Sequence, residues 1–291
     1  MTLNTQITCP VCLSSDTRVG LHFVRESAPG SVLLCDSCKS LSTVNRDNYR
    51  TTYADLTPDR LDAAHAWLQG EHKSRAFAQW LKLVESFSLG RLGQSALLDV
   101  GCGTGGFLRF AAPFVGSGWG FDHSSAQIAY ARQSFDIQSR VFRALSVGEF
   151  REQATVGEVD LITLWDVLEH LHDPELILRQ LREVAAKGAL VFVAVPNALF
   201  ARLKIKIWQK LSVDWTARLV PWEHVFYYSP LGLDRLLSRA GWKVIASGPV
   251  RNYDRAPSVG EWVRRRYSDL TFSIPWLKSL APQVFALARA N

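Results

Sequence analysis

The residues of this sequence that are best suited to chemistry begin with a glycine-rich loop, LDVGCGTGG, at residues 98–106. An apolar run precedes the loop and a helix-length segment follows it, which is the usual context of a nucleotide-binding turn. Glycines let such a loop turn tightly and let its backbone approach a ligand closely. Gly101, Gly103 and Gly106 satisfy the pattern G-x-G-x-x-G. A dehydrogenase is therefore one interpretation, although the pattern alone is weak evidence.

Two carboxylates near this loop favour a different ligand. Asp99 lies two residues before the first glycine, where it would repel the pyrophosphate of a dinucleotide but would suit an ammonium group and a sulfonium charge. Asp122 lies 21 positions after Gly101, at the end of the next predicted strand, where a carboxylate can accept hydrogen bonds from both hydroxyls of a ribose. S-adenosylmethionine carries all of these groups.

Four of the five cysteines form two C-x-x-C pairs near the N-terminus, Cys9 with Cys12 and Cys35 with Cys38. Each pair can present two thiolates, and two such pairs complete a tetrahedral zinc site with no open position. We therefore expect a structural zinc ion that holds together a segment too small to fold alone. The alternatives are a redox pair or unrelated thiols. The fifth cysteine, Cys102, lies in the glycine loop, where we expect it to fill space.

Two Glu-His pairs could serve acid–base chemistry. Glu169-His170 follows the fourth predicted strand, and Glu223-His224 lies beyond the fifth. Histidine titrates near neutral pH, so it is suited to take a proton from a weak nucleophile such as a hydroxyl. Adjacent side chains in an extended stretch point to opposite faces, so neither pair need be a dyad. The alternative is that both histidines pack against helices or cap them.

The elements that must position these residues alternate between strand and helix. Apolar runs predict strands at 96–100, 119–121, 141–144, 159–164, 189–195, 242–247 and 284–288. Helical spacing and capping residues predict helices at 59–88, 106–114, 124–133, 173–187 and 229–240. The helix at 173–187 begins with Asp173 and Pro174 and ends at Lys187 and Gly188. This order predicts an α/β fold with a doubly wound, mostly parallel sheet that binds ligands beyond the carboxyl ends of its strands.

Composition limits the classes of function. Of 291 residues, 47% are apolar and 21% are charged, which is typical of a globular protein. No run of about 18 uncharged apolar residues occurs, and the N-terminus lacks a secretory pattern, so we expect a cytoplasmic protein. The net charge of +6 permits a phosphate-bearing substrate or an anionic membrane surface without requiring nucleic acid.

At this point the chain resembles the class I S-adenosylmethionine-dependent methyltransferases. LLDVGCGTGGFL is similar to their first motif, GFDHS to the acidic second, and VDLITLWDVLEHLHDP to the segment after the fourth strand. The resemblance covers roughly residues 60–290. It implies a seven-stranded Rossmann-like sheet whose last strand is antiparallel. The residues that it implies for cofactor binding are Asp99, Gly101, Cys102, Gly103, Asp122, His123, Ala144, Leu145 and Trp165.

A zinc ribbon followed by such a domain resembles two groups, bacterial sugar or polysaccharide methyltransferases and ribosomal RNA base methyltransferases. The first is more similar because of WDVLEHLHDP, VPN and EHVFYYSPLGLDRLL. It implies a hydroxyl of a sugar, glycan or small metabolite as acceptor and makes a nucleic-acid partner unexpected. It also places Glu223 and His224 near the acceptor, and some related enzymes use a histidine that matches His170. His224 is the first candidate for the base and His170 the second. An RNA methyltransferase stays open as an alternative.

Residues 200–211 combine apolar positions with four basic residues and no acid. One interpretation is a lid over the active site. The other is a peripheral contact with an anionic inner-membrane surface, since ubiquinone-type O-methyltransferases carry a membrane-touching insertion at the corresponding place. The second interpretation would suit a lipid-linked or quinone-like acceptor.

The expected organisation is a zinc ribbon at 1–45, a helical linker with a cofactor-covering helix at 46–90, and a methyltransferase domain at 91–291. The N/D-P-P-Y/F motif that positions exocyclic amines is missing after the fourth strand, which argues against nucleobase and amide substrates. No acidic cluster marks a magnesium-dependent catechol-type enzyme. Oligomeric state is not readable from the sequence.

Overall fold

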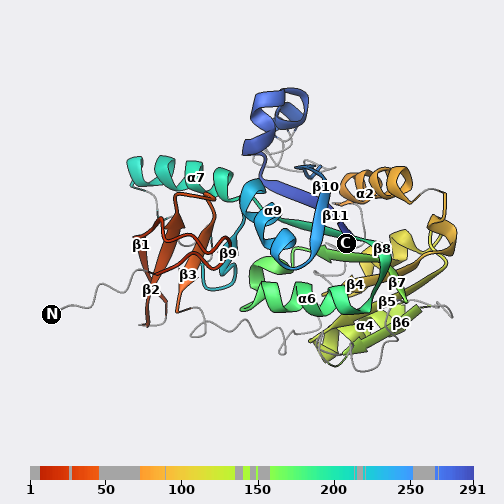
Figure 1. Cartoon of the computed structure of the whole chain (residues 1–291). Helices are drawn as coiled ribbons and strands as arrows, with labels where there is room; N and C mark the ends of the chain where they lie inside the picture. Colours follow the sequence, from red (N-terminus) through yellow and green to blue (C-terminus); the bar gives the residue numbers. More distant parts are fainter. Residues whose placement is uncertain are drawn as a thin grey trace.

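The structure, a computed structural model, contains one large and one small β-sheet (Figure 1). It describes residues 7–25, 28–45, 73–88, 90–134, 140–144, 149, 158–212, 214, 219, 221–251, 266–267 and 269–291.

The large sheet has seven strands in the order β10-β11-β8-β7-β4-β5-β6. The bounds are β4 Ala96–Val100, β5 Ser117–Asp122, β6 Arg140–Ala144, β7 Val159–Trp165, β8 Ala185–Pro196, β10 Trp242–Pro249 and β11 Gln283–Ala290. Strands β4 to β8 are parallel, and β11 runs antiparallel to both β8 and β10. The predicted α/β fold with an antiparallel last strand is therefore confirmed.

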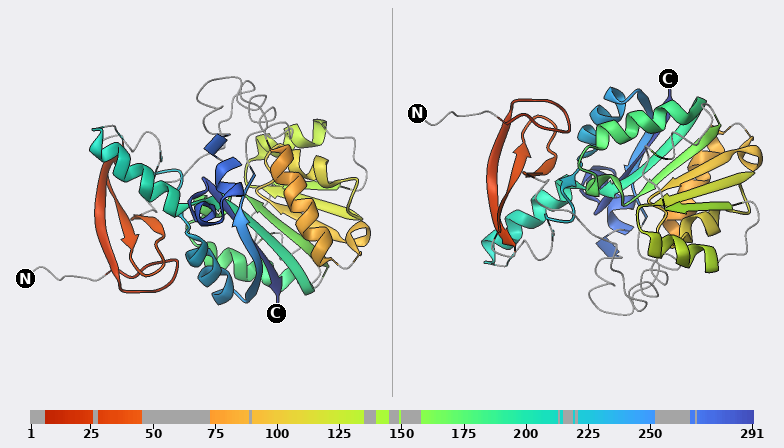
Figure 2. Two further views of the ribbon diagram at one scale, coloured as in Figure 1. Left: turned by 90° about the horizontal axis from the view of Figure 1, so that it is seen from above. Right: turned by 90° about the horizontal axis from the view of Figure 1, so that it is seen from below.

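Helices cover both faces of this sheet (Figure 2). Their bounds are α2 Ser74–Phe87, α3 Gly106–Ala111, α4 Ser125–Ser134, α6 Pro174–Val184 and α9 Pro230–Arg239. Neighbouring strand residues point to opposite faces, and the core divides accordingly. Leu98 packs in the cluster that holds Leu181 of α6 and Leu236 of α9, whereas Leu97 packs in the cluster that holds residues of α2, α3 and α4.

Two helix ends differ from the prediction. Helix α3 ends at Ala111 rather than at residue 114, because Pro113 lacks the backbone N–H that the next helical hydrogen bond requires. Helix α6 begins after Asp173 as predicted, but it ends at Val184 and β8 starts at once. The predicted stop at Lys187 and Gly188 was wrong. Gly188 has φ +78° and lies at a register shift between β7 and β8, so this glycine serves an irregularity in the strand. The predicted helix at 59–88 is described from Ser74 onwards, and its earlier part lies outside the described residues.

The small sheet has the order β1-β2-β3-β9, with β1 Thr17–Arg25, β2 Ala28–Cys35, β3 Leu41–Val44 and β9 Phe226–Tyr227. Strand β9 comes from the segment after β8, and it pairs Tyr227 with Leu41. The next residue, Tyr228, forms a parallel bridge to Asn197 at the end of β8. The small sheet is therefore not built from residues 1–45 alone, and β9 connects it to the segment that carries His224.

Helix α7, Ala198–Lys210, packs on the small sheet (Figure 1). Its buried positions are Ala198, Ala201 and Ile205. The opposite stripe of Leu203, Ile207 and Leu211 is exposed to solvent. None of the helices in the described ranges is long and apolar enough to cross a bilayer.

Candidate functional site

The glycine loop joins β4 to α3 and contains residues that could not carry larger side chains. Gly101, Gly103 and Gly105 have φ values of +66°, +55° and +81°, a region that favours glycine. A Cβ on Gly101 would lie 2.5 Å from Cγ2 of Val167. Thr104 in the same loop has a buried hydroxyl with no hydrogen-bond partner among the described residues. The loop therefore offers a close backbone approach and a polar group to a ligand.

The two predicted carboxylates lie at the ends of neighbouring strands. Asp99 is buried, and the hydroxyl of Thr163 donates to its Oδ1 at 2.7 Å. Burial raises the pKa of Asp99 to about 7, against the hydrogen bond from Thr163. Asp122 accepts from the backbone N–H of Gly103 at 3.1 Å and of Ser124 at 2.9 Å. A carboxylate has about four acceptor sites, so Asp122 holds the loop and keeps capacity for ligand hydroxyls.

The structure brings some of the other predicted cofactor contacts to the same edge. Ala144 ends β6 opposite Asp122, while Leu145 lies outside the described residues. The His123 side chain is 61% exposed, with Nδ1 3.4 Å from Oδ1 of Asp122. Cys102 is buried, and burial raises the pKa of its thiol well above its ordinary value. It therefore stays protonated, as expected of a residue that fills space.

Trp165, at the end of β7, packs its ring among the aromatic side chains under the loop. Its ring centroid lies 5.1 Å from Phe77, 5.2 Å from Phe107 and 4.7 Å from Phe192. Its indole N–H is buried and has no hydrogen-bond partner in the described part of the chain. Buried polar groups are normally satisfied, so this N–H and the hydroxyl of Thr104 fit a site that receives a polar ligand.

Sequence reasoning missed an ion pair beside this site. Lys73, just before α2, is buried and donates from Nζ to Oδ2 of Asp166. Gln283 of β11 donates to the other oxygen of the same carboxylate. Asp166 follows β7 with φ +54°, a strained conformation of the kind that gathers at functional sites. No local pattern in the sequence links Lys73 to Asp166, so this pair was not predicted.

Glu169, His170 and His224 come together just beyond β7. The first two lie in the 3-10 turn η3, Leu168–His170, and the third precedes β9. One potential metal-ligand atom of each residue lies within 4.8 Å of those of the other two, and the two histidine ring centroids are 4.8 Å apart. Glu169 is fully buried, and neither carboxylate oxygen has a hydrogen-bond partner among the described residues.

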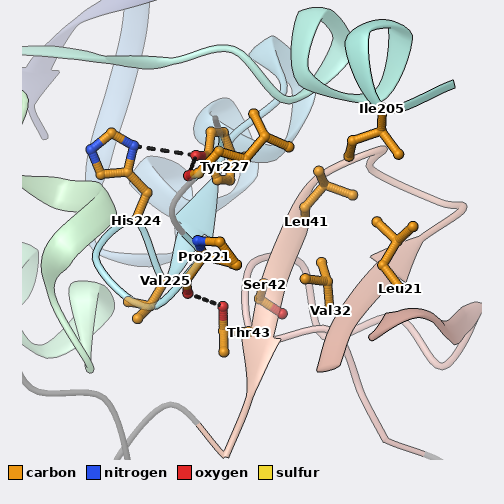
Figure 3. A pocket seen from close by; sticks show the side chains of 11 residues that line it. Leu21, Val32, Leu41, Ser42, Thr43, Ile205, Pro221, His224, Val225 and Tyr227 are labelled. Atoms are coloured by element: carbon orange, nitrogen blue, oxygen red, sulfur yellow. Dashed lines mark hydrogen bonds between the residues drawn. The ribbon is translucent and has the colours of Figure 1, made fainter. Parts of the chain in front are cut away.

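Hydrogen bonds fix the tautomers of both histidines. Nδ1 of His170 lies 2.9 Å from the backbone carbonyl oxygen of Glu223, which can only accept, so this nitrogen carries the proton. The hydroxyl of Tyr227 donates to the carbonyl of Leu219, so it can only accept from Nδ1 of His224 at 3.3 Å (Figure 3). In both neutral rings the lone pair is therefore on Nε2.

Burial also keeps these imidazoles neutral near pH 7. It lowers the pKa of His170, and it lowers the pKa of His224 to about 4 with a further contribution from His170. A neutral imidazole can accept a proton or bind a metal ion. Glu223 contributes its backbone carbonyl to His170, and its carboxylate is not part of the group formed by Glu169, His170 and His224.

A small apolar cavity lies beside His224 (Figure 3). Its walls come from the small sheet, from α7 and from the segment before β9, and they include Leu21, Val32, Leu41, Ile205, Pro221 and Tyr227. The small sheet therefore contributes side chains to the surroundings of a candidate catalytic residue.

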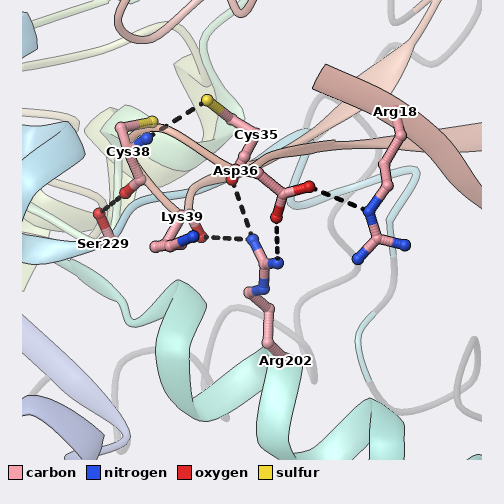
Figure 4. Close-up of polar contacts among 7 residues, drawn as sticks. All are labelled: Arg18, Cys35, Asp36, Cys38, Lys39, Arg202 and Ser229. Carbon is pink, nitrogen blue, oxygen red and sulfur yellow. Dashed lines mark hydrogen bonds and ion pairs between the residues drawn. The ribbon is translucent and has the colours of Figure 1, made fainter. Parts of the chain in front are cut away.

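The four N-terminal cysteines form one cluster, and Figure 4 shows two of them, Cys35 and Cys38. Sγ of Cys9 lies 3.8 Å from Sγ of Cys38, and Sγ of Cys12 lies 3.6 Å from Sγ of Cys35. All four are free thiols. A tetrahedral zinc ion with Zn–S bonds of about 2.3 Å separates its sulfurs by about 3.8 Å, so the spacing suits zinc.

Other elements hold this cluster in place. Arg202 of α7 donates to the carbonyl of Cys35 at 3.0 Å and to Asp36 at 3.0 Å (Figure 4). Ser229, the N-cap of α9, donates to the carbonyl of Cys38. The cluster is thus tied to the chain on both sides of β9.

Curated proteins include distant relatives of this chain. The chain is 28% identical over 149 residues to the ubiquinone biosynthesis O-methyltransferase of Hydrogenovibrio crunogenus (strain DSM 25203 / XCL-2). The matched region covers 50% of this chain and 61% of that protein. The chain thus matches less than two thirds of this relative's length. The expected resemblance to sugar methyltransferases stays a hypothesis.

Solved structures share the fold. Phosphoethanolamine N-methyltransferase 2 of Haemonchus contortus, bound to S-adenosyl-L-methionine, superposes with a TM-score of 0.58 at 14% identity, over 82% of this chain and 60% of that one. Magnesium protoporphyrin IX methyltransferase of Synechocystis PCC 6803 gives 0.54 at 14% identity, over 82% and 96%.

A family model described as a methyltransferase domain matches residues 71–247, which include the loop, both acids and both histidines. The chain therefore belongs to this methyltransferase family, and it carries an N-terminal four-cysteine cluster.

Proposed function

We propose that this protein transfers a methyl group from S-adenosylmethionine to a hydroxyl oxygen of a sugar, glycan or related small metabolite, with His224 as proton acceptor. The observation that carries the proposal is the pair of neutral imidazoles beyond β7, His170 and His224, each with its lone pair on Nε2. A hydroxyl is a poor nucleophile at neutral pH, so a neutral imidazole within reach assists its attack.

The other residues have roles that follow from their chemistry. When bound, S-adenosylmethionine supplies a methyl group on a positively charged sulfur. Asp99 would face the ammonium group of the methionine end, and Asp122 would accept from the ribose hydroxyls. The buried N–H of Trp165 and the hydroxyl of Thr104 would supply donors to the same ligand. The backbone carbonyl of Glu223 orients His170, which assists His224.

The test of this proposal is a methyl-transfer screen with labelled S-adenosylmethionine over hydroxylated sugars, glycans and quinols. In the wild type we expect a product methylated on oxygen. His224→Ala should lower turnover by about 10²-fold and leave affinity for S-adenosylhomocysteine unchanged, and His22→Ala on exposed β1 serves as the control. Unchanged turnover in His224→Ala, or methylation on nitrogen or carbon, would contradict the proposal.

A phenolic, quinone-like or lipid-linked acceptor is the second candidate. It is supported by the similarity to a ubiquinone biosynthesis O-methyltransferase and by the apolar walls of the cavity beside His224. The exposed stripe of Leu203, Ile207 and Leu211, next to exposed Lys206 and Lys210 on α7, would suit a peripheral contact with an anionic lipid surface. Binding to anionic but not neutral vesicles, lost in Leu203→Ser/Ile207→Ser, tests this candidate.

We also propose that the four cysteines bind a structural zinc ion and that the partner is a small molecule rather than nucleic acid. Four thiolates leave no open coordination position. Tight RNA binding with a steep dependence on salt would contradict the second statement and favour an RNA methyltransferase.

A further inference from the structure

We propose that Glu169, His170 and His224 bind a divalent metal ion beside the acceptor, at a site separate from the four cysteines. The proposed methyl transfer to a hydroxyl gives this ion its role, but the binding site itself rests only on the geometry of these residues.

The first argument is the carboxylate of Glu169. It is fully buried, and both of its oxygens have no hydrogen-bond partner among the described residues. Burying such a group is costly unless a cation or hydrogen-bond donors compensate for the lost hydration. The neighbouring cation, Lys73, is already engaged with Asp166. A metal ion would satisfy the carboxylate.

The second argument is the geometry of the two histidines. One potential ligand atom of each of the three residues lies within 4.8 Å of the others. Metal–ligand bonds of about 2.1 Å place neighbouring ligands of an octahedral or tetrahedral ion about 3.0–3.4 Å apart. Binding an ion would therefore draw the three groups together, by no more than about 1.8 Å for any pair.

The third argument is the support of both rings. Metal-binding histidines usually donate from the other nitrogen to a backbone carbonyl or a similar acceptor, which fixes the tautomer. His170 donates from Nδ1 to the carbonyl of Glu223, and Nδ1 of His224 lies against the hydroxyl of Tyr227. Both neutral rings thus have the lone pair of Nε2 available for a metal ion.

The donor set indicates which ions fit. Two imidazoles and one carboxylate form a site of intermediate hardness with open positions, suited to ions such as Mn²⁺, Fe²⁺ or Co²⁺. The four thiolates form a softer, closed site suited to zinc. The two sites should therefore bind different ions.

The open positions would take the acceptor. A hydroxyl oxygen bound to the ion loses its proton more readily, and that proton leaves to water. The oxygen then attacks the methyl carbon, the carbon–sulfur bond breaks, and the products are the methyl ether and S-adenosylhomocysteine. In the loaded site Nε2 of His224 is a ligand, so the ion takes over the activation that His224 alone would provide. The net methyl transfer is unchanged.

The experiment is a titration of Mn²⁺ into the full-length protein that already holds one zinc ion per chain, followed by electron paramagnetic resonance. Bound Mn²⁺ loses the sharp signal of the aqueous ion. We expect one Mn²⁺ per chain in the wild type, with affinity lowered at least tenfold in Glu169→Gln, His170→Ala and His224→Ala and unchanged in His22→Ala. Affinity for S-adenosylhomocysteine checks that each variant is folded.

Thermal unfolding gives a second readout that does not depend on activity. Mn²⁺ should raise the midpoint of the wild type and leave that of Glu169→Gln unchanged, because ligands stabilise only the state that binds them. Without Mn²⁺, Glu169→Gln should be at least as stable as the wild type, since it removes a buried carboxylate.

Two results separate this inference from the proposed function. If no Mn²⁺ binds, or if Glu169→Gln binds it as tightly as the wild type, the inference is wrong even where His224→Ala loses turnover and His224 acts directly on the hydroxyl. If Mn²⁺ binds as expected but no hydroxyl compound is methylated, the metal site stands and the proposed function fails.

Discussion

Asp99 is mostly protonated in the unliganded protein at pH 6 because burial raises its pKa from 3.8 to about 7. An ammonium group bound beside it would favour the carboxylate, so binding of the cofactor at pH 6 should release this proton. Affinity for S-adenosylmethionine should then rise by about tenfold between pH 6 and pH 8. Calorimetry in buffers of different ionisation enthalpy measures both quantities, and Asp99→Asn should show neither change.

The same shift makes a prediction for stability. The pKa of Asp99 is higher in the folded state than its ordinary value, so its contribution to the free energy of unfolding is fully present below pH 3.8 and is lost as pH rises through 7. The unliganded protein should therefore lose stability over this range, and Asp99→Asn should lose less. An equal slope of unfolding free energy against pH in both proteins would show that the carboxyl is not buried as described.

Gly101 and Gly90 allow the effect of packing on a glycine substitution to be separated from the effect of backbone conformation. Both have positive φ, at +66° and +79°, but a Cβ on Gly101 would lie 2.5 Å from Val167, whereas a Cβ on Gly90 meets nothing within 4 Å. Gly90→Ala should cost about 1 kcal/mol through its backbone alone. Gly101→Ala should cost clearly more in denaturant unfolding, and Val167→Ala should relieve part of that excess. Equal losses of unfolding free energy at the two positions would show that the contact with Val167 does not restrict Gly101.

At the scale of elements, the N-caps of α6 and α9 allow a similar comparison. Asp173 accepts only from the first turn of α6, at the surface. Ser229 accepts from Gly232 of α9 and also donates to the carbonyl of Cys38. Asp173→Ala should cost about 1 kcal/mol, and Ser229→Ala about 2–3 kcal/mol because a buried bond is lost as well. Chemical denaturation measures both, and equal losses would argue against a link between α9 and the cysteine cluster.

Elements with strong local signals were predicted from the sequence. Strand β4 and its glycine loop, the cap at Asp173 and the cap at Ser229 all follow from residue types within a few positions. Gly188 misled the prediction because a glycine after a helix resembles a stop signal, while its actual place in β8 depends on pairing with β7. Strand β9 was missed because two residues show no periodicity.

The candidate site could be predicted only where its residues belong to local patterns. Asp99, Asp122 and the cysteines belong to local patterns. The meeting of Glu169 with His224 depends on how η3 and the segment before β9 lie together, and the pairing of Lys73 with Asp166 joins residues 93 positions apart. Such contacts are set by tertiary packing, which no short window of sequence contains.

At the scale of the whole molecule, the small sheet connects the cysteine cluster to the candidate acceptor site. The backbone N–H of Thr43 in β3 donates to the carbonyl of Val225 at 2.8 Å, next to His224. We expect removal of the bound metal by a chelator to loosen β1 to β3 together with the segment that carries His224, while Asp99 and Asp122 stay in place.

This expectation separates acceptor chemistry from cofactor binding. After chelation, S-adenosylhomocysteine should bind with unchanged affinity while methyl transfer is largely lost, and hydrogen exchange should accelerate at Leu41–Val44 and Phe226–Tyr227 but not in β4. Readdition of zinc should restore slow exchange in both segments. If exchange in β9 stays slow after the metal is removed, the small sheet does not support the acceptor site.

Strand β9 also determines how a fragment without it should behave. Residues 1–45 expressed by themselves would leave the outer side of β3 without its partner, and an unprotected strand edge invites pairing with other chains. Such a fragment should self-associate, whereas addition of a peptide spanning residues 221–230 should suppress that association. The N-terminal unit is thus not independent of the rest of the chain, because β3 pairs with the strand that follows His224.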